Sequence, residues 1–185
     1  MSKANRWRNP TYFADLLEKK GMIDMAELSN HLLGQSLQAL LAEAFDGIAE
    51  NGNSWFTESK PGQGLFGAVE GLTAAQASRQ PASGHASIAA HLEHLRYSLS
   101  LANRWSHGEE PYDTADWSTA WKKNAVSDNE WKQLLSHLHR EYSNWKTALA
   151  ADSRWTGDEL TGKMASIVHI AYHLGAIRHM VLHIR

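Results

Sequence analysis

Two histidines near the C-terminus have a spacing that suits chemistry. His169 and His173 lie four positions apart, so on a helix their side chains fall about 40° from each other and point the same way. Ala165, Ile177 and Met180 fall on the same side of the helical wheel, which predicts that both histidines are buried. A buried imidazole needs a hydrogen-bonding partner or a metal ion, and two neutral imidazoles at this spacing can bind one divalent ion from a single helix.

A second pair of histidines offers a third ligand. His91 and His94 lie three positions apart in the segment that follows Ser87. Both side chains can face one site, or one can bind an ion while the other supports it through a hydrogen bond. Two apolar stripes on this segment predict a helix that packs against two neighbours: a main stripe of Ile88, Leu92, Leu95, Leu99 and Ala102, and a second stripe of His94, Leu101 and Trp105. His91 lies nearer to the main stripe, so helical periodicity favours it as the inward residue. With the downstream pair on another helix, these residues predict a three-imidazole site between facing helices.

The remaining candidates have simpler interpretations. Glu93 points about 100° away from the histidine that follows it on a helix and is expected to be a surface charge, which leaves no visible general base. His179 and His183 lie too far along the last helix to share an ion with the HxxxH pair. Trp117 and Trp121 either line a substrate entrance or pack against the body of the protein.

The elements that must position these histidines are helices. No segment alternates at period two, so we expect an all-α protein with four long helices. Capping boxes begin two of them, at Asp24 and Ser127. The four long helices are predicted at 25–50, from after 84 to about 105, from 127 to about 149, and at 162–183. A short leading helix is predicted at 10–20 and a brief helical turn within 65–72. The chain is predicted to turn at 152–160 before the last helix.

The long connection at 108–126 bears on the topology. About 18 residues can extend roughly 60 Å, which is more than the length of a helix of about 25 residues. A crossover is therefore permitted, and it would leave the second and third long helices parallel. Short links, by contrast, favour antiparallel neighbours.

Composition excludes several classes of function. The 185-residue chain has no cysteine, which excludes disulfides, thiolate metal ligands and a cysteine nucleophile. A net charge of -2 without blocks of like charge argues against binding to nucleic acid, and no apolar run is long enough to span a bilayer. We therefore expect a soluble cytoplasmic protein with one domain over 1–185 and a short helical extension at about 1–24.

The two histidine segments resemble those of the DinB/YfiT-like superfamily of metal-binding bundle proteins. The likeness covers roughly 30–185 and is carried by the segment after Ser87 and by the segment from His169 to Ile177. In that family the first metal ligand is the histidine seven residues after the serine or threonine that opens the helix, which here is His94. The second and third ligands come from an HxxxH motif on the last helix, which here gives His169 and His173.

The resemblance thus favours His94 over His91, and it leaves His91 as a residue that supports the ligands from behind. In many family members, one residue separates the final ligand from a Gly-Gln pair, where this chain has Gly175 and Ala176. Any role of the glutamine side-chain amide is therefore missing from this chain. The resemblance implies an up-down-down-up four-helix bundle. It also implies a divalent metal cofactor, with zinc or nickel expected and iron or copper also compatible with imidazole ligands.

Three neutral imidazoles leave coordination positions free, as expected of a catalytic metal centre. The resemblance therefore implies a metal-dependent enzyme that activates a thiol or water for transfer to, or hydrolysis of, a small-molecule substrate. The family includes transferases and isomerases that use low-molecular-weight thiols, and hydrolases. The alternative is a non-catalytic metal-binding bundle or a stress-linked interaction module. We expect no nucleic acid or membrane partner, and a homodimer is left open.

Overall fold

The computed structural model describes residues 30–150 and 155–184, and this part of the chain is helical. Within those residues there is no strand, only an isolated antiparallel bridge between Gly47 and Pro61, so the all-α prediction is confirmed. None of the described helices combines the length and the hydropathy that a bilayer span requires. In chain order they are α2 (Asn30–Asp46), α3 (Leu65–Val69), α4 (Ala74–Ala77), α5 (Ile88–Ser106), η2 (Pro111–Thr114), α6 (Trp117–Ala120), α7 (Asp128–Ala150) and α8 (Gly157–Leu182).

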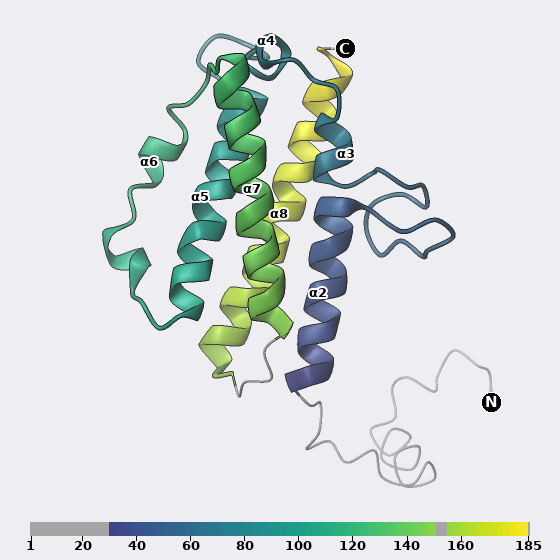
Figure 1. Ribbon diagram of the computed structural model, residues 1–185, viewed down its shortest axis with the longest axis vertical. Helices are drawn as coiled ribbons and strands as arrows, with labels where there is room; N and C mark the ends of the chain where they lie inside the picture. The colour runs from purple at the N-terminus through teal and green to yellow at the C-terminus, as the bar shows by residue number, and fades with distance from the viewer. Residues whose placement is uncertain (1–29, 151–154, 185) are drawn as a thin grey trace, which may run out of the picture.

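Four long helices, α2, α5, α7 and α8, pack side by side (Figure 1). Helix α5 packs against both α7 and α8, and α2 packs against the same two helices. Followed from N- to C-terminus, α2 and α8 run upward in Figure 1, whereas α5 and α7 run downward. Helices α5 and α7 are therefore parallel, and the connection between them, which contains η2 and α6, returns along the outer side of α5.

Hydrogen bonds at both ends of α5 and α7 agree with this parallel arrangement. Near the start of the two helices, the backbone N–H of Ser87 donates to Oδ1 of Asn124 at 2.9 Å. Farther along, Nδ2 of Asn103 donates to the backbone oxygen of Glu141 at 3.0 Å and to its Oε2 at 2.9 Å. The connection between the two helices is a crossover of the kind that its length permits.

Helix α5 packs on two sides because it carries two apolar stripes, as the sequence predicts. Ile88, Leu92 and Leu95 on the main stripe are fully buried, and Leu101 on the second stripe is 2% exposed. Burial of each such side chain contributes roughly 1.5–3 kcal/mol. The bundle is therefore held mainly by its apolar faces.

The first described helix ends earlier than predicted. Helix α2 ends at Asp46 rather than near residue 50, because Gly47 adopts a φ of 78° and ends the helix with a left-handed residue. The predicted leading helix at 10–20 and the first residues of the predicted helix at 25–50 lie outside the described residues.

The last helix, by contrast, begins earlier than predicted. Thr156 is its N-cap, and the Thr156 hydroxyl accepts a hydrogen bond from the backbone N–H of Glu159 while the Glu159 carboxylate accepts one from the backbone N–H of Thr156. This reciprocal capping box starts α8 at Gly157 rather than at residue 162. The predicted turn at 152–160 is therefore wrong for its last residues.

One buried carboxylate fastens the loop that follows α2. Glu43 is 3% exposed, and its Oε1 accepts hydrogen bonds from the hydroxyls of Ser54 and Thr57 at 2.7 and 2.8 Å. The same carboxylate accepts from the backbone N–H groups of Trp55, Phe56 and Thr57. Burial by itself raises the pKa of Glu43, but these hydrogen bonds outweigh burial and lower the pKa to about 2. The ionised carboxylate therefore holds the loop against α2.

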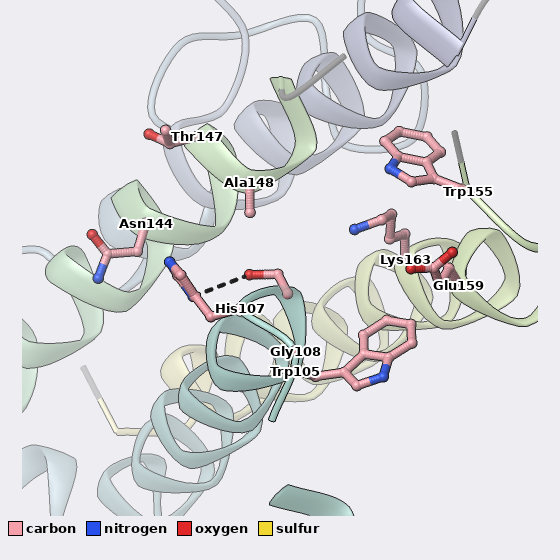
Figure 2. Close-up of a pocket in the computed structure, with 10 residues that line it drawn as sticks. Trp105, His107, Gly108, Asn144, Thr147, Ala148, Trp155, Glu159 and Lys163 are labelled. Carbon is pink, nitrogen blue, oxygen red and sulfur yellow. Dashed lines mark hydrogen bonds between the residues drawn. The ribbon is translucent and has the colours of Figure 1, made fainter. Parts of the chain in front are cut away.

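A lysine is buried at the end of the bundle where α8 begins. Lys163 is 5% exposed, and its Nζ lies 5.0 Å from the ring centroids of Trp145 and Trp155 and 5.7 Å from that of Trp105. Figure 2 shows the ammonium group between Trp105 and Trp155. Cation–π contacts of this kind stabilise a charge that water no longer surrounds.

Candidate metal centre

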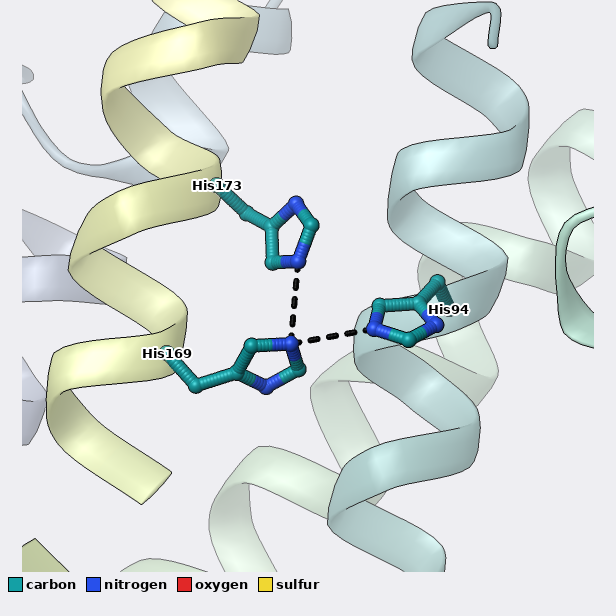
Figure 3. Close-up of side chains that lie close together, drawn as sticks. All are labelled: His94, His169 and His173. Carbon is teal, nitrogen blue, oxygen red and sulfur yellow. Dashed lines mark hydrogen bonds between the residues drawn. The ribbon is translucent and has the colours of Figure 1, made fainter. Parts of the chain in front are cut away.

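Three histidines from two helices converge inside the bundle. His94 on α5 and His169 and His173 on α8 point toward one another (Figure 3). The Nε2 atom of His169 lies 3.0 Å from Nε2 of His94 and 2.9 Å from Nε2 of His173. One ring nitrogen from each residue lies within 4.8 Å of the other two. The fold thus brings together the three histidines that the resemblance to the family selects as metal ligands.

The start of α5 sets which histidine of the upstream pair faces α8. Ser87 is the N-cap, and its side chain accepts a hydrogen bond from the backbone N–H of Ala90 at 3.2 Å. Seven residues are about two helical turns, so His94 lies on the same face of α5 as Ser87. On α8 the four-residue spacing places His169 and His173 on one face. A shift of one residue in either helix would rotate its ligands away by about 100°.

The environment keeps these imidazoles neutral. His94 and His173 are buried, and burial, with smaller contributions from His169 and His91, lowers the pKa of His94 to about 4. Burial, together with the surrounding histidines, lowers the pKa of His173 to about 3, and burial also lowers the pKa of His169. Near neutral pH each ring therefore has a lone pair available for a metal ion.

The donor set fits a divalent ion. Two imidazole nitrogens bound to a tetrahedral ion at about 2.0–2.1 Å are roughly 3.3 Å apart, and the Nε2 atoms of His94 and His173 each lie within a few tenths of an ångström of that distance from Nε2 of His169. Without an ion, each close contact between two imidazole nitrogens requires a proton on one of them. An ion would satisfy all three lone pairs at once.

The wider sequence agrees with this site. Residues 62–182 match the sequence profile of the DinB superfamily, which covers more than half of the 185-residue chain. The chain belongs to the DinB superfamily. No curated protein and no solved structure matches it. The family resemblance of the two histidine segments is therefore confirmed, and the three clustered histidines all lie in the matched region of this DinB protein.

His91 of the DinB protein contacts the cluster from behind. Its Nδ1 lies 2.9 Å from Nδ1 of His173, so His173 directs Nε2 toward His169 and Nδ1 toward His91. The second ring nitrogen of a ligand imidazole is commonly hydrogen-bonded in this way, which fixes its tautomer and orientation. The periodicity argument for His91 as the inward residue fails because α5 is buried along two stripes and His94 lies on the second.

His94, by contrast, is oriented by stacking. Its Nδ1 is buried and has no hydrogen-bond partner within the described residues. Trp121 stacks on the ring with a centroid distance of 4.2 Å and an interplanar angle of 22°, and Trp117 lies 5.7 Å from it. Of the two interpretations of these tryptophans, packing against the bundle is correct for Trp121. Because that packing falls on His94, Trp121 also forms one wall of the candidate metal centre.

Three contacts hold the crossover of the DinB protein against α5 and its N-cap. The backbone N–H of Asp116 donates to the hydroxyl of Tyr97 on α5 at 3.0 Å, and the rings of Tyr97 and Trp117 meet edge to face at 5.7 Å. At the far end of the crossover, Asn124 accepts the hydrogen bond from the N-cap Ser87. Both sides of Trp121 are thus fixed to α5.

An apolar groove on α8 reaches the cluster at His169. It has a volume of about 620 Å³ and is lined by Thr161, Met164, Ala165, Val168, His169 and Tyr172. Ile177 and Met180 are buried as predicted, but the expectation that Ala165 is buried beside the histidines is wrong, since Ala165 is exposed. The reason is that His169 lies at the edge of the buried face, and the groove begins there.

The other sequence candidates lie away from the cluster. Glu93 makes a two-pronged ion pair with Arg96 at 2.6 and 2.9 Å, and it is half-buried rather than the exposed surface charge expected from the sequence. His179 and His183 contact each other, with ring centroids 4.8 Å apart. No carboxylate among the described residues belongs to the cluster.

Sequence reasoning missed one polar neighbour of the cluster. Ser98 Oγ lies 3.4 Å from Nδ1 of His169. Ser98 lies four positions after His94, so it shares a helical face with that residue, and this spacing is the signal that could have identified it.

Proposed function

We propose that this DinB protein is a metal-dependent enzyme in which His94, His169 and His173 hold one divalent ion, most simply zinc or nickel. The proposal is carried by the convergence of three neutral imidazoles on one point, in a cluster that the described residues leave without a fourth ligand. Three protein ligands leave a position for substrate or water, which is the pattern of catalytic rather than structural centres. Iron and copper also accept imidazole ligands.

The proposed reaction is either the conjugation of a thiol with a small-molecule substrate or the hydrolysis of a small-molecule substrate. A divalent ion at this site supplies Lewis acidity, which lowers the pKa of a thiol or water that it binds. The three histidines add no negative charge to the site. His91 holds the ring of His173, while Trp121 covers the ring of His94 and excludes water from that side.

The groove beside His169 supports a substrate with an apolar portion. Met164, Val168 and Tyr172 form exposed apolar walls, and His169 connects them to the cluster. A small molecule whose reacting group lies at the histidines can bury its apolar portion here, which contributes about 25 cal/mol per Å². The chain has no cysteine, so the thiol in a transfer reaction must be a separate low-molecular-weight thiol.

The helix directions support an up-down-down-up bundle as the fold of this enzyme. The parallel arrangement of α5 and α7 requires the crossover to travel the length of α5 (Figure 1). That path carries Trp121 to the level of His94. A short antiparallel connection would leave this side of the candidate metal centre without a cover.

A non-catalytic metal-binding bundle is the second candidate, including one that acts as a stress-linked interaction module. It is favoured by one observation: within the part of the chain that the structure describes, the cluster contains only histidines, with no carboxylate to serve as a general base. In that case the ion would add stability without turnover.

Elemental analysis of the purified protein, followed by a thiol-conjugation and hydrolysis screen on the metal-loaded sample, tests the proposal. We expect one ion per chain and activity that His169→Ala and His173→Ala abolish. His137→Ala is the matched control, because His137 is exposed on α7 and outside the cluster.

The outcomes separate the two candidates. Stoichiometric metal binding without turnover on any thiol or ester substrate would favour the non-catalytic bundle. Full metal content in both α8 variants would show that the ion is held elsewhere and that the site assignment is wrong.

A further inference from the structure

A second cavity lies at the end of the bundle where α5 and α7 finish and α8 begins. Its volume is about 640 Å³, and the residues used below all line it: Trp105, His107, Asn144, Trp155, Glu159 and Lys163 (Figure 2). Trp105 follows His94 by eleven positions on α5, which is about 16 Å along the helix. This cavity is therefore separate from the candidate metal centre.

Lys163 has no anionic partner within the described part of the chain. Its Nζ contacts the three indole rings, and the nearest acidic residue of α8, Glu159, directs its carboxylate to the backbone N–H of Thr156 at 2.6 Å. Burial lowers the pKa of Lys163, and the charge of Glu159 opposes this shift. A buried ammonium group without a hydrogen-bond acceptor is unfavourable, so an acceptor in the cavity would stabilise it.

The shape and charge of the cavity select the kind of acceptor. Among the described residues, neither an arginine nor a second lysine lines it, so the single ammonium group suits a monoanion better than a phosphate, which needs more donors. Trp105 and Trp155 lie on either side of the Lys163 side chain in Figure 2, and flat indole walls favour a planar apolar body. The volume lies within the range of small-molecule sites.

We propose that this cavity binds a small aromatic carboxylate. The carboxylate accepts a hydrogen bond from Nζ of Lys163, and the aromatic ring packs against Trp105 and Trp155. Asn144 and His107 stand across the cavity from Lys163 (Figure 2). The protein would then have a ligand site that needs no metal.

Calorimetric titration of the full-length protein with sodium benzoate tests the proposal. The protein is kept metal-free with a chelator, so that benzoate cannot bind an ion at the histidines. Benzamide has the same shape without the charge, and cyclohexanecarboxylate has the charge without the planar ring. We expect benzoate to bind at least about tenfold more tightly than benzamide, with cyclohexanecarboxylate also weaker than benzoate.

Lys163→Met removes the donor while it keeps a long apolar side chain among the indoles. We expect this variant to lose at least about tenfold in benzoate affinity, whereas Lys132→Met, an exposed lysine on α7, keeps the wild-type value. Absence of benzoate binding to wild type, equal affinity for benzamide, or an unchanged affinity in Lys163→Met would each overturn the proposal. If circular dichroism shows that Lys163→Met is unfolded, the ratio of benzoate to benzamide affinity on wild type decides.

Discussion

At the scale of single residues, each clustered histidine is held by a different contact. His173 has its second ring nitrogen against His91 at 2.9 Å, and His169 has its Nδ1 3.4 Å from the hydroxyl of Ser98. His94 has an unpartnered Nδ1 and depends on stacking. A hydrogen bond fixes both the tautomer and the ring orientation, whereas stacking fixes only the plane of the ring. Removal of these supports should therefore have unequal effects.

We expect His91→Ala to weaken zinc binding by about 10- to 100-fold without abolishing it. The reason is that the variant keeps all three clustered histidines and loses only the partner of Nδ1 in His173. Competition with a chromophoric chelator measures the affinity, with His137→Ala as the control. A loss as complete as that of His173→Ala would identify His91 as a ligand instead of a support.

At the scale of elements, the crossover between α5 and α7 is as important to the site as the helices that carry the ligands. Its two short helices, η2 and α6, have no long apolar stripe. Its position is set by hydrogen bonds to Tyr97 and Ser87 on α5. Trp121 lies between these anchor points and stacks on His94.

We expect Trp121→Ala to weaken zinc binding by about 2- to 10-fold, the loss that corresponds to one aromatic contact. Trp121→Phe should recover most of the affinity because a phenyl ring can stack on the same imidazole. The chelator competition assay measures both variants. Equal affinities in wild type and Trp121→Ala would show that the crossover covers His94 without orienting it.

The loop after α2 depends on one carboxylate, so its stability should depend on pH. The folded pKa of Glu43 is about 2, below its ordinary value of 4.5. Its contribution is therefore complete above about pH 4.5 and is lost as the pH falls toward about 2. The shift corresponds to about 3 kcal/mol.

We accordingly expect Glu43→Gln to lower the free energy of unfolding by about 2–3 kcal/mol near neutral pH, and by less than half as much near pH 3. Urea denaturation of both proteins at the two pH values measures the difference. The two proteins share all other titratable groups, so the contributions of those groups cancel in the difference between wild type and variant. A constant difference between the two proteins at both pH values would contradict the assignment of the charge to this loop.

At the scale of the whole molecule, the apolar core connects the four long helices without help from the histidines. Leu41, Leu95, Leu138 and Ile177, one from each helix, are fully buried. The cluster lies to one side of this core, between α5 and α8. The bundle should therefore stay folded without metal.

We expect a chelator to lower the melting temperature of wild type by roughly 5–10 °C while the helical signal at room temperature is unchanged. This estimate follows from about 2.7 kcal/mol of stabilisation at a metal concentration of about 100 times the Kd. His169→Ala should be helical and insensitive to the chelator. Circular dichroism melting of both proteins measures this. Unfolding of wild type on metal removal would show that the ion is needed for folding and would weaken the enzyme proposal.

The local features of the site could be predicted from the sequence alone. Any helix that contains His169 and His173 presents them on one face, because the helical period fixes their angle. The apolar stripes of α5 predict its two packing partners, and the serine that caps it sets the register of His94. These features depend only on residues a few positions apart, which is why they can be read from the chain.

Only the tertiary structure decided which faces meet. Periodicity by itself ranks His91 above His94 and buries Ala165, since it reports the faces of one helix and not the position of its neighbours. Trp121 reaches the cluster through a connection without helical period. Lys163 has the sequence signature of a surface charge, yet it is buried because the indoles of Trp105, Trp145 and Trp155 surround it. Burial is set by contacts between residues far apart in the chain, and no local pattern contains that information.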